Sequence, residues 1–252
     1  MRRKLPTVPA FAALRTFGHG ALAAARRYLE LGTIGLLLLI SGCLWIFAEL
    51  ADEASEGSTR EFDTAVLLAF RDPADPSDPL GPTWLEEFGR DVTALGGLGL
   101  LAVITLAVAG FLWLRDRRGT AILILLAIGS GQLMSFVFKL GFDRSRPELV
   151  PHGMATYTSS FPSGHAMMAA VTYLTLAVLL ARVQEGRRIK IYILSVAVII
   201  TVAVGISRIY LGVHWPTDVL AGWTAGAAWA FGCLLVANWL HRLGLIGGRG
   251  RD

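Results

Sequence analysis

The chain has 252 residues, of which 54% are hydrophobic and 17% are charged, whereas soluble domains typically carry about 25% charged residues. This composition and a mean hydropathy of +0.57 exclude a soluble globular protein and indicate an integral membrane protein. The net charge of +4 would weakly suggest a nucleic-acid or anionic-lipid partner. Its distribution along the chain matters more, and we expect membrane lipids rather than nucleic acid as partners.

The N-terminal segment 1–28 is basic, and its two prolines and several charges argue against a cleavable signal peptide. Residues 10–28 could form an amphipathic helix on the inner leaflet or a disordered basic tail. Residues 29–242 are predicted to form an all-α domain, an integral membrane bundle of six transmembrane helices. Residues 243–252 are predicted to form a cytoplasmic C-terminal tail.

Six apolar stretches approach or reach the roughly twenty residues that a helix needs to cross the hydrocarbon core. They cover residues 31–50, 94–114, 120–142, 165–180, 189–209 and 219–239. The connecting loop 51–93 is acidic and rich in proline, and residues 62–70 could form a short helix at the membrane surface. No catalytic constellation is visible in this loop, although it could cap a site.

Lysine and arginine in short loops indicate the cytoplasmic side of a membrane protein. One side carries the basic N-terminal segment together with Arg115, Arg117, Arg118, Arg182, Arg187, Arg188, Lys190, Arg242, Arg249 and Arg251. We therefore expect both termini in the cytoplasm and the loop 51–93 outside. The expected location is the plasma (inner) membrane, with multiple spans.

Two features concern packing rather than chemistry. Cys43 and Cys233 lie inside apolar runs, so neither a zinc site nor a disulfide framework is expected. Small residues at 221, 222, 225 and 226 share one face of the last span, where they would let helices pack closely. Packing within the bundle is the favoured interpretation over a dimer face, and monomer and dimer both stay open.

Three stretches bring ionisable groups to the external ends of the predicted spans. They are Lys139 to Arg146-Pro147, Pro162-Ser163-Gly164-His165, and Ser207-Arg208 to His214 and Asp218. Cationic side chains and a helix N-terminus can bind phosphate oxygens, and histidine can act as a nucleophile or carry a proton. Taken alone, the third stretch could also be an ion-paired loop.

Together these stretches resemble the signature of the type 2 phosphatidic acid phosphatase superfamily. Its pattern is Lys-x6-Arg-Pro, Pro-Ser-Gly-His and Ser-Arg-x5-His-x3-Asp, and every fixed position is filled between residues 139 and 218. The resemblance implies that His214 attacks phosphorus to give a phosphohistidine, that Asp218 orients His214, and that His165 protonates the leaving oxygen. The phosphate-binding residues that it implies are Lys139, Arg146, Ser163, Gly164 and Arg208.

No cofactor and no metal are expected, because carboxylates near the motifs are few. Asp143 and Glu148 could simply pair with Arg144 and Arg146. The expected substrate is a lipid phosphate or diphosphate, with undecaprenyl diphosphate slightly ahead of phosphatidic acid and phosphatidylglycerophosphate. Two alternatives remain: a vanadium haloperoxidase, which shares the site in this superfamily, and a non-enzymatic lipid-phosphate binder or transporter.

Overall fold

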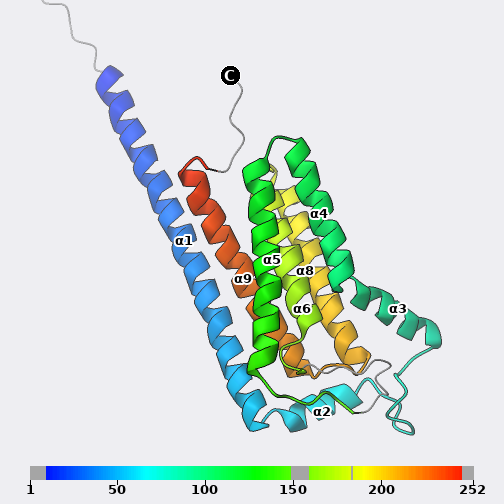
Figure 1. Ribbon diagram of the computed structural model, residues 1–252. Helices are drawn as coiled ribbons and strands as arrows, with labels where there is room; N and C mark the ends of the chain where they lie inside the picture. The colour runs from blue at the N-terminus through cyan, green and yellow to red at the C-terminus, as the bar shows by residue number, and fades with distance from the viewer. Residues whose placement is uncertain (1–9, 149–158, 183, 246–252) are drawn as a thin grey trace, which may run out of the picture. The chain divides into compact units, whose positions relative to one another are not determined.

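The computed structural model describes residues 10–148, 159–182 and 184–245, with side chains from residue 31 onward (Figure 1). Every element in these ranges is a helix, apart from one isolated bridge between Arg71 and Pro79. The helices are α1 (Ala10–Glu56), α2 (Arg60–Leu68), α3 (Thr83–Ala94), α4 (Leu98–Leu114), α5 (Arg118–Gly141), α6 (Gly164–Ala169), η1 (Ala170–Leu174), α7 (Thr175–Arg182), α8 (Arg187–Tyr210) and α9 (Pro216–Arg242). The all-α prediction is confirmed.

The described residues fall into two compact units, which divide between Leu38 and Leu39. In the first unit, α1 is helical from Ala10 onward, so a helix is found where the sequence left a disordered tail open. This helix continues without a break past residue 28, and its placement on the cytoplasmic side stays a prediction. The second unit contains all three sequence motifs.

Five helical segments are long and apolar enough to cross a membrane: Leu31–Glu56, Arg118–Gly141, Gly164–Arg182, Arg187–Tyr210 and Pro216–Arg242. The second predicted span, residues 94–114, differs from the expectation. Its helical part is α4, which begins at Leu98, and α3 precedes α4 at an angle of 48°. The two helices pass the same test only as a bent pair, so the described residues contain five candidate spans, or six with the pair counted as one.

The bend between α3 and α4 has a packing cause at Gly96. A Cβ atom built at this position would lie 2.6 Å from Cγ1 of Val204 on α8 and 3.0 Å from the carbonyl oxygen of His165 on α6. Only glycine lets the chain pass so close to both helices. The bend therefore brings the end of α3 against α6, the helix that carries the motif histidine His165.

The span made of α6, η1 and α7 is the central helix of the bundle, and its residues 166–172 are all buried. It packs closely on α9, because Cβ atoms built at Gly222 and Gly226 would lie 2.7 Å from the Ser163 oxygen and 2.5 Å from Ala170 Cβ. Within one chain, the small-residue face of α9 is thus covered by α6 and η1. This confirms the interpretation that the face packs inside the bundle.

The loop 51–93 is more ordered than its composition suggested. The short helix expected at residues 62–70 is present as α2, at Arg60–Leu68. Leu67 of α2 is fully buried and packs in a cluster with Trp215 and Val219. Arg71 is also buried, and its Nη2 donates to the Tyr210 carbonyl oxygen at the end of α8 over 2.8 Å. The loop 51–93 is therefore packed onto the motif-bearing ends of α8 and α9.

Candidate active site

Backbone hydrogen bonds join the three motif segments to one another. The Ser160 N–H donates to the Arg144 carbonyl oxygen over 2.9 Å, which links the first segment to the second. The Ser163 N–H donates to the Asp218 carbonyl oxygen over 2.9 Å, which links the second segment to the third. These bonds fix the helix starts at Gly164 and Pro216 side by side, although more than fifty residues separate them.

Side chains close the remaining connection, between the first and third segments. The Trp215 indole Nε1 donates to the Ser145 carbonyl oxygen over 2.9 Å. Arg146 Nη1 donates to the Val213 carbonyl oxygen over 3.0 Å. Because all three segments are tied pairwise, their polar side chains have little freedom to move apart.

His214 lies in the middle of this arrangement and is only 2% exposed. Its Nε2 is 3.1 Å from Arg146 Nη1, and its Nδ1 is 3.4 Å from Asp218 Oδ2 and 3.3 Å from Ser160 Oγ. A guanidinium can only donate hydrogen bonds, so Nε2 carries the lone pair and Nδ1 carries the proton. That tautomer leaves Nε2 available as a nucleophile.

Burial sets the charge of His214. It lowers the pKa of His214 to about 3, although the hydrogen bond to Asp218 acts in the opposite direction. The imidazole is therefore neutral at physiological pH. Attack on phosphorus requires this form, because only a neutral imidazole has a free lone pair.

Asp218 is fully buried in the first turn of α9 and accepts hydrogen bonds with both carboxylate oxygens. Oδ2 accepts from the Ser160 hydroxyl over 2.5 Å and from the Trp215 N–H over 3.0 Å. Oδ1 accepts from Arg144 Nη1 over 2.6 Å. The same carboxylate thus caps the start of α9 and faces Nδ1 of His214, as the predicted orienting role requires.

Lys139, Arg146 and Arg208 lie close enough to interact electrostatically with one another and with His165. Lys139 Nζ donates to the Ser159 carbonyl oxygen over 2.9 Å, and Arg208 Nη1 donates to Thr93 Oγ1 over 3.1 Å. The three cations therefore come from separate elements and gather at one place. Such a cluster is unfavourable unless an anion binds there.

Several buried donors in this cluster have no partner within the described residues: the Nε atoms of Arg146 and Arg208, and the Ser163 hydroxyl. Buried polar atoms are normally hydrogen-bonded. A phosphate group would supply acceptor oxygens for atoms of this kind. All three residues are among the phosphate-binding residues that the resemblance implies.

Gly164 and His165 begin the central helix beside the cations. A Cβ atom at Gly164 would lie 3.2 Å from Lys139 Cε and 3.7 Å from Ser135 Oγ, so a side chain here would crowd the lysine. The His165 ring is half-buried and makes no hydrogen bond to any other described side chain or backbone group. Its ring nitrogens are therefore available to a ligand, and its role as a proton donor stays a prediction.

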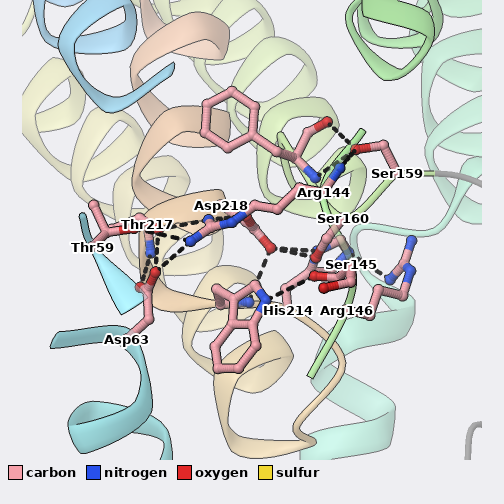
Figure 2. A network of polar contacts seen from close by, with 12 residues as sticks. Thr59, Asp63, Arg144, Ser145, Arg146, Ser159, Ser160, His214, Thr217 and Asp218 are labelled. Atoms are coloured by element: carbon pink, nitrogen blue, oxygen red, sulfur yellow. Dashed lines mark hydrogen bonds and ion pairs between the residues drawn. The ribbon is translucent and has the colours of Figure 1, made fainter. Parts of the chain in front are cut away.

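The structure overturns one expectation. Arg144 does not pair with Asp143 or Glu148; its guanidinium bridges Asp63 and Asp218, with both N–O distances at 2.6 Å (Figure 2). Asp63 comes from α2 and is fully buried. Arg144 occupies a variable position of the Lys-x6-Arg-Pro pattern, so the pattern alone did not single it out.

Ser160 and Asp63 are further residues that the sequence did not indicate. Ser160 directly precedes the Phe161-Pro162 pair of the second motif, a position that the signature leaves unspecified. Asp63 is one of eleven acidic residues in the loop 51–93, and no spacing distinguishes it from the others. The only available signal in the sequence was its distance of four positions from Leu67, which puts both side chains on one face of a helix. Both are buried in α2.

No group of three or more metal-ligating side chains occurs among residues 31–148, 159–182 and 184–245. Cys43 and Cys233 are free thiols within α1 and α9. The expectation of a metal-independent site stays a prediction.

Comparison with known proteins agrees with this geometry. The family model of the PAP2 superfamily matches residues 120–242. Phosphatidylglycerophosphatase B of Bacillus subtilis (strain 168) is 38% identical over 146 residues, which cover 57% of this chain and 70% of that protein. The putative undecaprenyl-diphosphatase YbjG of Escherichia coli (strain K12) is 31% identical over 140 residues, which cover 54% of this chain and 65% of that protein.

A solved structure shows the same fold. The crystal structure of a transmembrane PAP2 type phosphatidylglycerolphosphate phosphatase from Bacillus subtilis superposes with a TM-score of 0.69 at 30% sequence identity. The match covers 80% of this chain and 96% of that one. With the motif residues gathered at one end of the same helical bundle, the chain belongs to the PAP2 superfamily and is a multi-pass membrane phosphatase.

Proposed function

We propose that this membrane phosphatase removes a phosphate group from a membrane lipid through a phosphohistidine formed on His214. The observation that carries the proposal is the position of His214 Nε2, which lies 3.1 Å from Arg146 Nη1 at the edge of the cation cluster. A phosphate held by those cations would present its phosphorus atom to the imidazole. Three cations would also offset the charge that spreads over the phosphoryl oxygens in the transition state.

The proposed reaction has two steps. In the first, the Nε2 lone pair of His214 forms the N–P bond while the bond between phosphorus and the leaving oxygen breaks, and His165 gives that oxygen its proton. In the second, water attacks phosphorus, His165 takes a proton from the water, and the N–P bond breaks to release phosphate. Asp218 balances the positive charge of the phosphorylated imidazole in the interval.

We further propose that the site opens to the outside of the plasma membrane. The support is the distribution of cations in the loops, because the ends of the helices opposite the motifs carry Arg115, Arg117 and Arg118. Labelling of single cysteines in intact cells tests this orientation. A cysteine at position 75 should react before permeabilisation. Reaction only after permeabilisation would contradict the proposed orientation.

The proposed substrate is phosphatidylglycerophosphate, the substrate class named for the relative with 38% identity and for the solved structure with 30% identity. Undecaprenyl diphosphate is the second candidate, favoured by the expected outward site and by a relative of that name with 31% identity. The cation cluster binds the phosphate group that both lipids share. Selectivity must therefore come from the remainder of the headgroup and from the chain.

The experiment that tests the proposal is phosphate release by purified protein in detergent, with EDTA present. The substrates are phosphatidylglycerophosphate, phosphatidic acid, undecaprenyl diphosphate and undecaprenyl monophosphate at equal surface concentration. We expect phosphate release from at least one lipid and inhibition by vanadate. The chelator should not lower the activity, because side-chain cations, and not a metal ion, would neutralise the phosphate charge. A strict need for added Mg²⁺ would contradict the mechanism.

A further inference from the structure

One guanidinium in the site is shared between two buried carboxylates. Arg144 Nη1 is 2.6 Å from Asp218 Oδ1, and Arg144 Nη2 is 2.6 Å from Asp63 Oδ2. Arg144 Nη1 also donates to Thr217 Oγ1 over 2.8 Å, and Nη2 donates to Thr59 Oγ1 over 3.0 Å. Figure 2 shows Arg144 lying between the two carboxylates, which belong to α2 and α9.

Asp63 is held by α9 as well as by the arginine. Its Oδ1 accepts from the Thr217 N–H over 2.9 Å, and its Oδ2 accepts from the Thr217 hydroxyl over 2.7 Å. Thr217 directly precedes Asp218 in the first turn of α9. Asp63 is therefore connected to Asp218 by two routes, through Arg144 and through the backbone of α9.

The charges of this group do not cancel. Asp63 and Asp218 are fully buried and Arg144 is 14% exposed at its side chain, so two negative charges share one positive charge. If Asp63 were absent, Arg144 would neutralise Asp218 alone. With Asp63 present, one net negative charge remains beside Nδ1 of His214.

That remaining charge matters because the other ionised groups facing His214 are positive. Arg146 contacts its Nε2, and Arg208 from α8 acts on it electrostatically. Both cations oppose the positive charge that His214 gains when Nε2 forms a bond to phosphorus. Only a carboxylate that keeps its charge can compensate for this at close range.

On the basis of the proposed function, we propose that Asp63 is a positioning residue for phosphoryl transfer, which acts by sharing Arg144 with Asp218 so that Asp218 keeps its negative charge toward His214. The loop 51–93, which carries α2, thereby takes part in catalysis, although it contains none of the three motifs. Asp63 does not touch the phosphate. Its effect should consequently fall on the rate of phosphohistidine formation and leave substrate binding nearly unchanged.

The first test is Asp63→Asn in the full-length protein, which keeps the size of the side chain and removes its charge. We expect kcat to fall about 10- to 100-fold, by analogy with the partners that orient the ligands of metal sites. KM should stay within about twofold, because the cation cluster is intact. The control is Glu61→Gln on the same helix, which removes an exposed carboxylate without a contact to the site.

The second test is a rescue that a merely structural role would not produce. Arg144→Gln leaves two buried carboxylates side by side, an arrangement that strongly disfavours the ionised forms. Adding Asp63→Asn to Arg144→Gln returns the group to one negative charge. We expect the double variant to turn over at least about fivefold faster than Arg144→Gln alone; a double variant that is equal or slower overturns the proposal.

Two further outcomes are informative. If Asp63→Asn does not fold, Arg144→Lys is tested in its place. Lysine keeps the net charge of the group, so the kcat of Arg144→Lys should stay well above that of Arg144→Gln. An equal loss of kcat in these two variants overturns the proposal. If wild-type protein releases no phosphate from any lipid, the proposed function fails. If the wild type is active and Asp63→Asn matches it in kcat, only the present inference fails.

Discussion

The two ends of the helical bundle are built on different principles. At the motif end, hydrogen bonds and ion pairs join the segment after α5, the segment before α6 and the start of α9. Figure 2 shows part of this network. At the opposite end, α4, α5 and α7 surround a cavity of about 530 Å³ lined mostly by apolar side chains. Arg115 and Arg117 border this cavity. Arg115 lies over the Phe111 ring and forms no ion pair with another described residue.

Because of this difference, the two ends should tolerate different kinds of substitution. A buried polar network loses free energy whenever one member is left without its partner. An apolar lining loses only the contacts of the atoms that are removed. Catalysis should therefore be sensitive to single polar changes at the motif end and tolerant of polar changes at the other.

The largest effect is expected from His214→Ala. Without the imidazole no phosphohistidine can form, so kcat should fall by about 10⁴-fold or more on every substrate. The measurement is steady-state phosphate release together with trapping of an acid-labile phosphoprotein. Detection of a phosphoenzyme in this variant would show that another residue is the nucleophile.

A smaller and substrate-dependent loss is expected from His165→Ala. General-acid catalysis typically contributes about 10²- to 10⁴-fold, and this share shrinks as the leaving group improves. The kcat of the variant should fall strongly on a lipid with an alkoxide leaving group and much less on p-nitrophenyl phosphate. Equal losses of kcat on both substrates would remove His165 from the role of proton donor.

These two predictions rest on residues that the sequence identified. His165, His214 and Asp218 were predicted because their spacing matches a known signature, and the structure brings them to one place. The span at 189–209 was also close to the observed α8 at Arg187–Tyr210, because an apolar run of fixed length leaves little choice. Local pattern was sufficient in both cases.

Long-range polar pairing was not predictable in the same way. Asp63 and Asp218 are 155 positions apart in the chain, and the acidic loop gave no reason to select one carboxylate as buried. The bend at Gly96 was missed as well, because it depends on the approach of Val204 and His165 from other helices. Both features follow from tertiary contacts that hydrophobic periodicity does not encode.

The packing that carries Asp218 into place offers an intermediate test. Gly226→Ala would put a Cβ 2.5 Å from Ala170 Cβ and 2.6 Å from the Met167 oxygen, so α9 or η1 must shift. Overpacking of this kind typically destabilises by about 1–3 kcal/mol. We expect a lower Tm in detergent and a reduced kcat, since α9 also positions Asp218.

The matched control for Gly226→Ala is Gly232→Ala on the same helix, where an added Cβ meets no atom within 4 Å. Alanine is the better helix former, so the Tm of this variant should be unchanged or slightly higher. An equal loss of Tm in both variants would mean that the contact with η1 is not what limits the position of α9.

The smallest effect is expected at the opposite end, from Arg117→Gln compared with Arg144→Gln. The chemical change is identical, but Arg117 is exposed at the start of α5 and makes no ion pair with any described residue, whereas Arg144 bridges two buried carboxylates. Exposed substitutions away from such features change stability little. We therefore expect Arg117→Gln to keep kcat within about twofold of the wild type, because no polar partner is left behind.

Lipid-phosphate hydrolysis and Tm, measured for both variants in the same detergent, check the contrast. A loss of kcat for Arg117→Gln as large as that for Arg144→Gln would mean that the two ends are coupled through the helices, and that the polar network does not confine the chemistry to one of them.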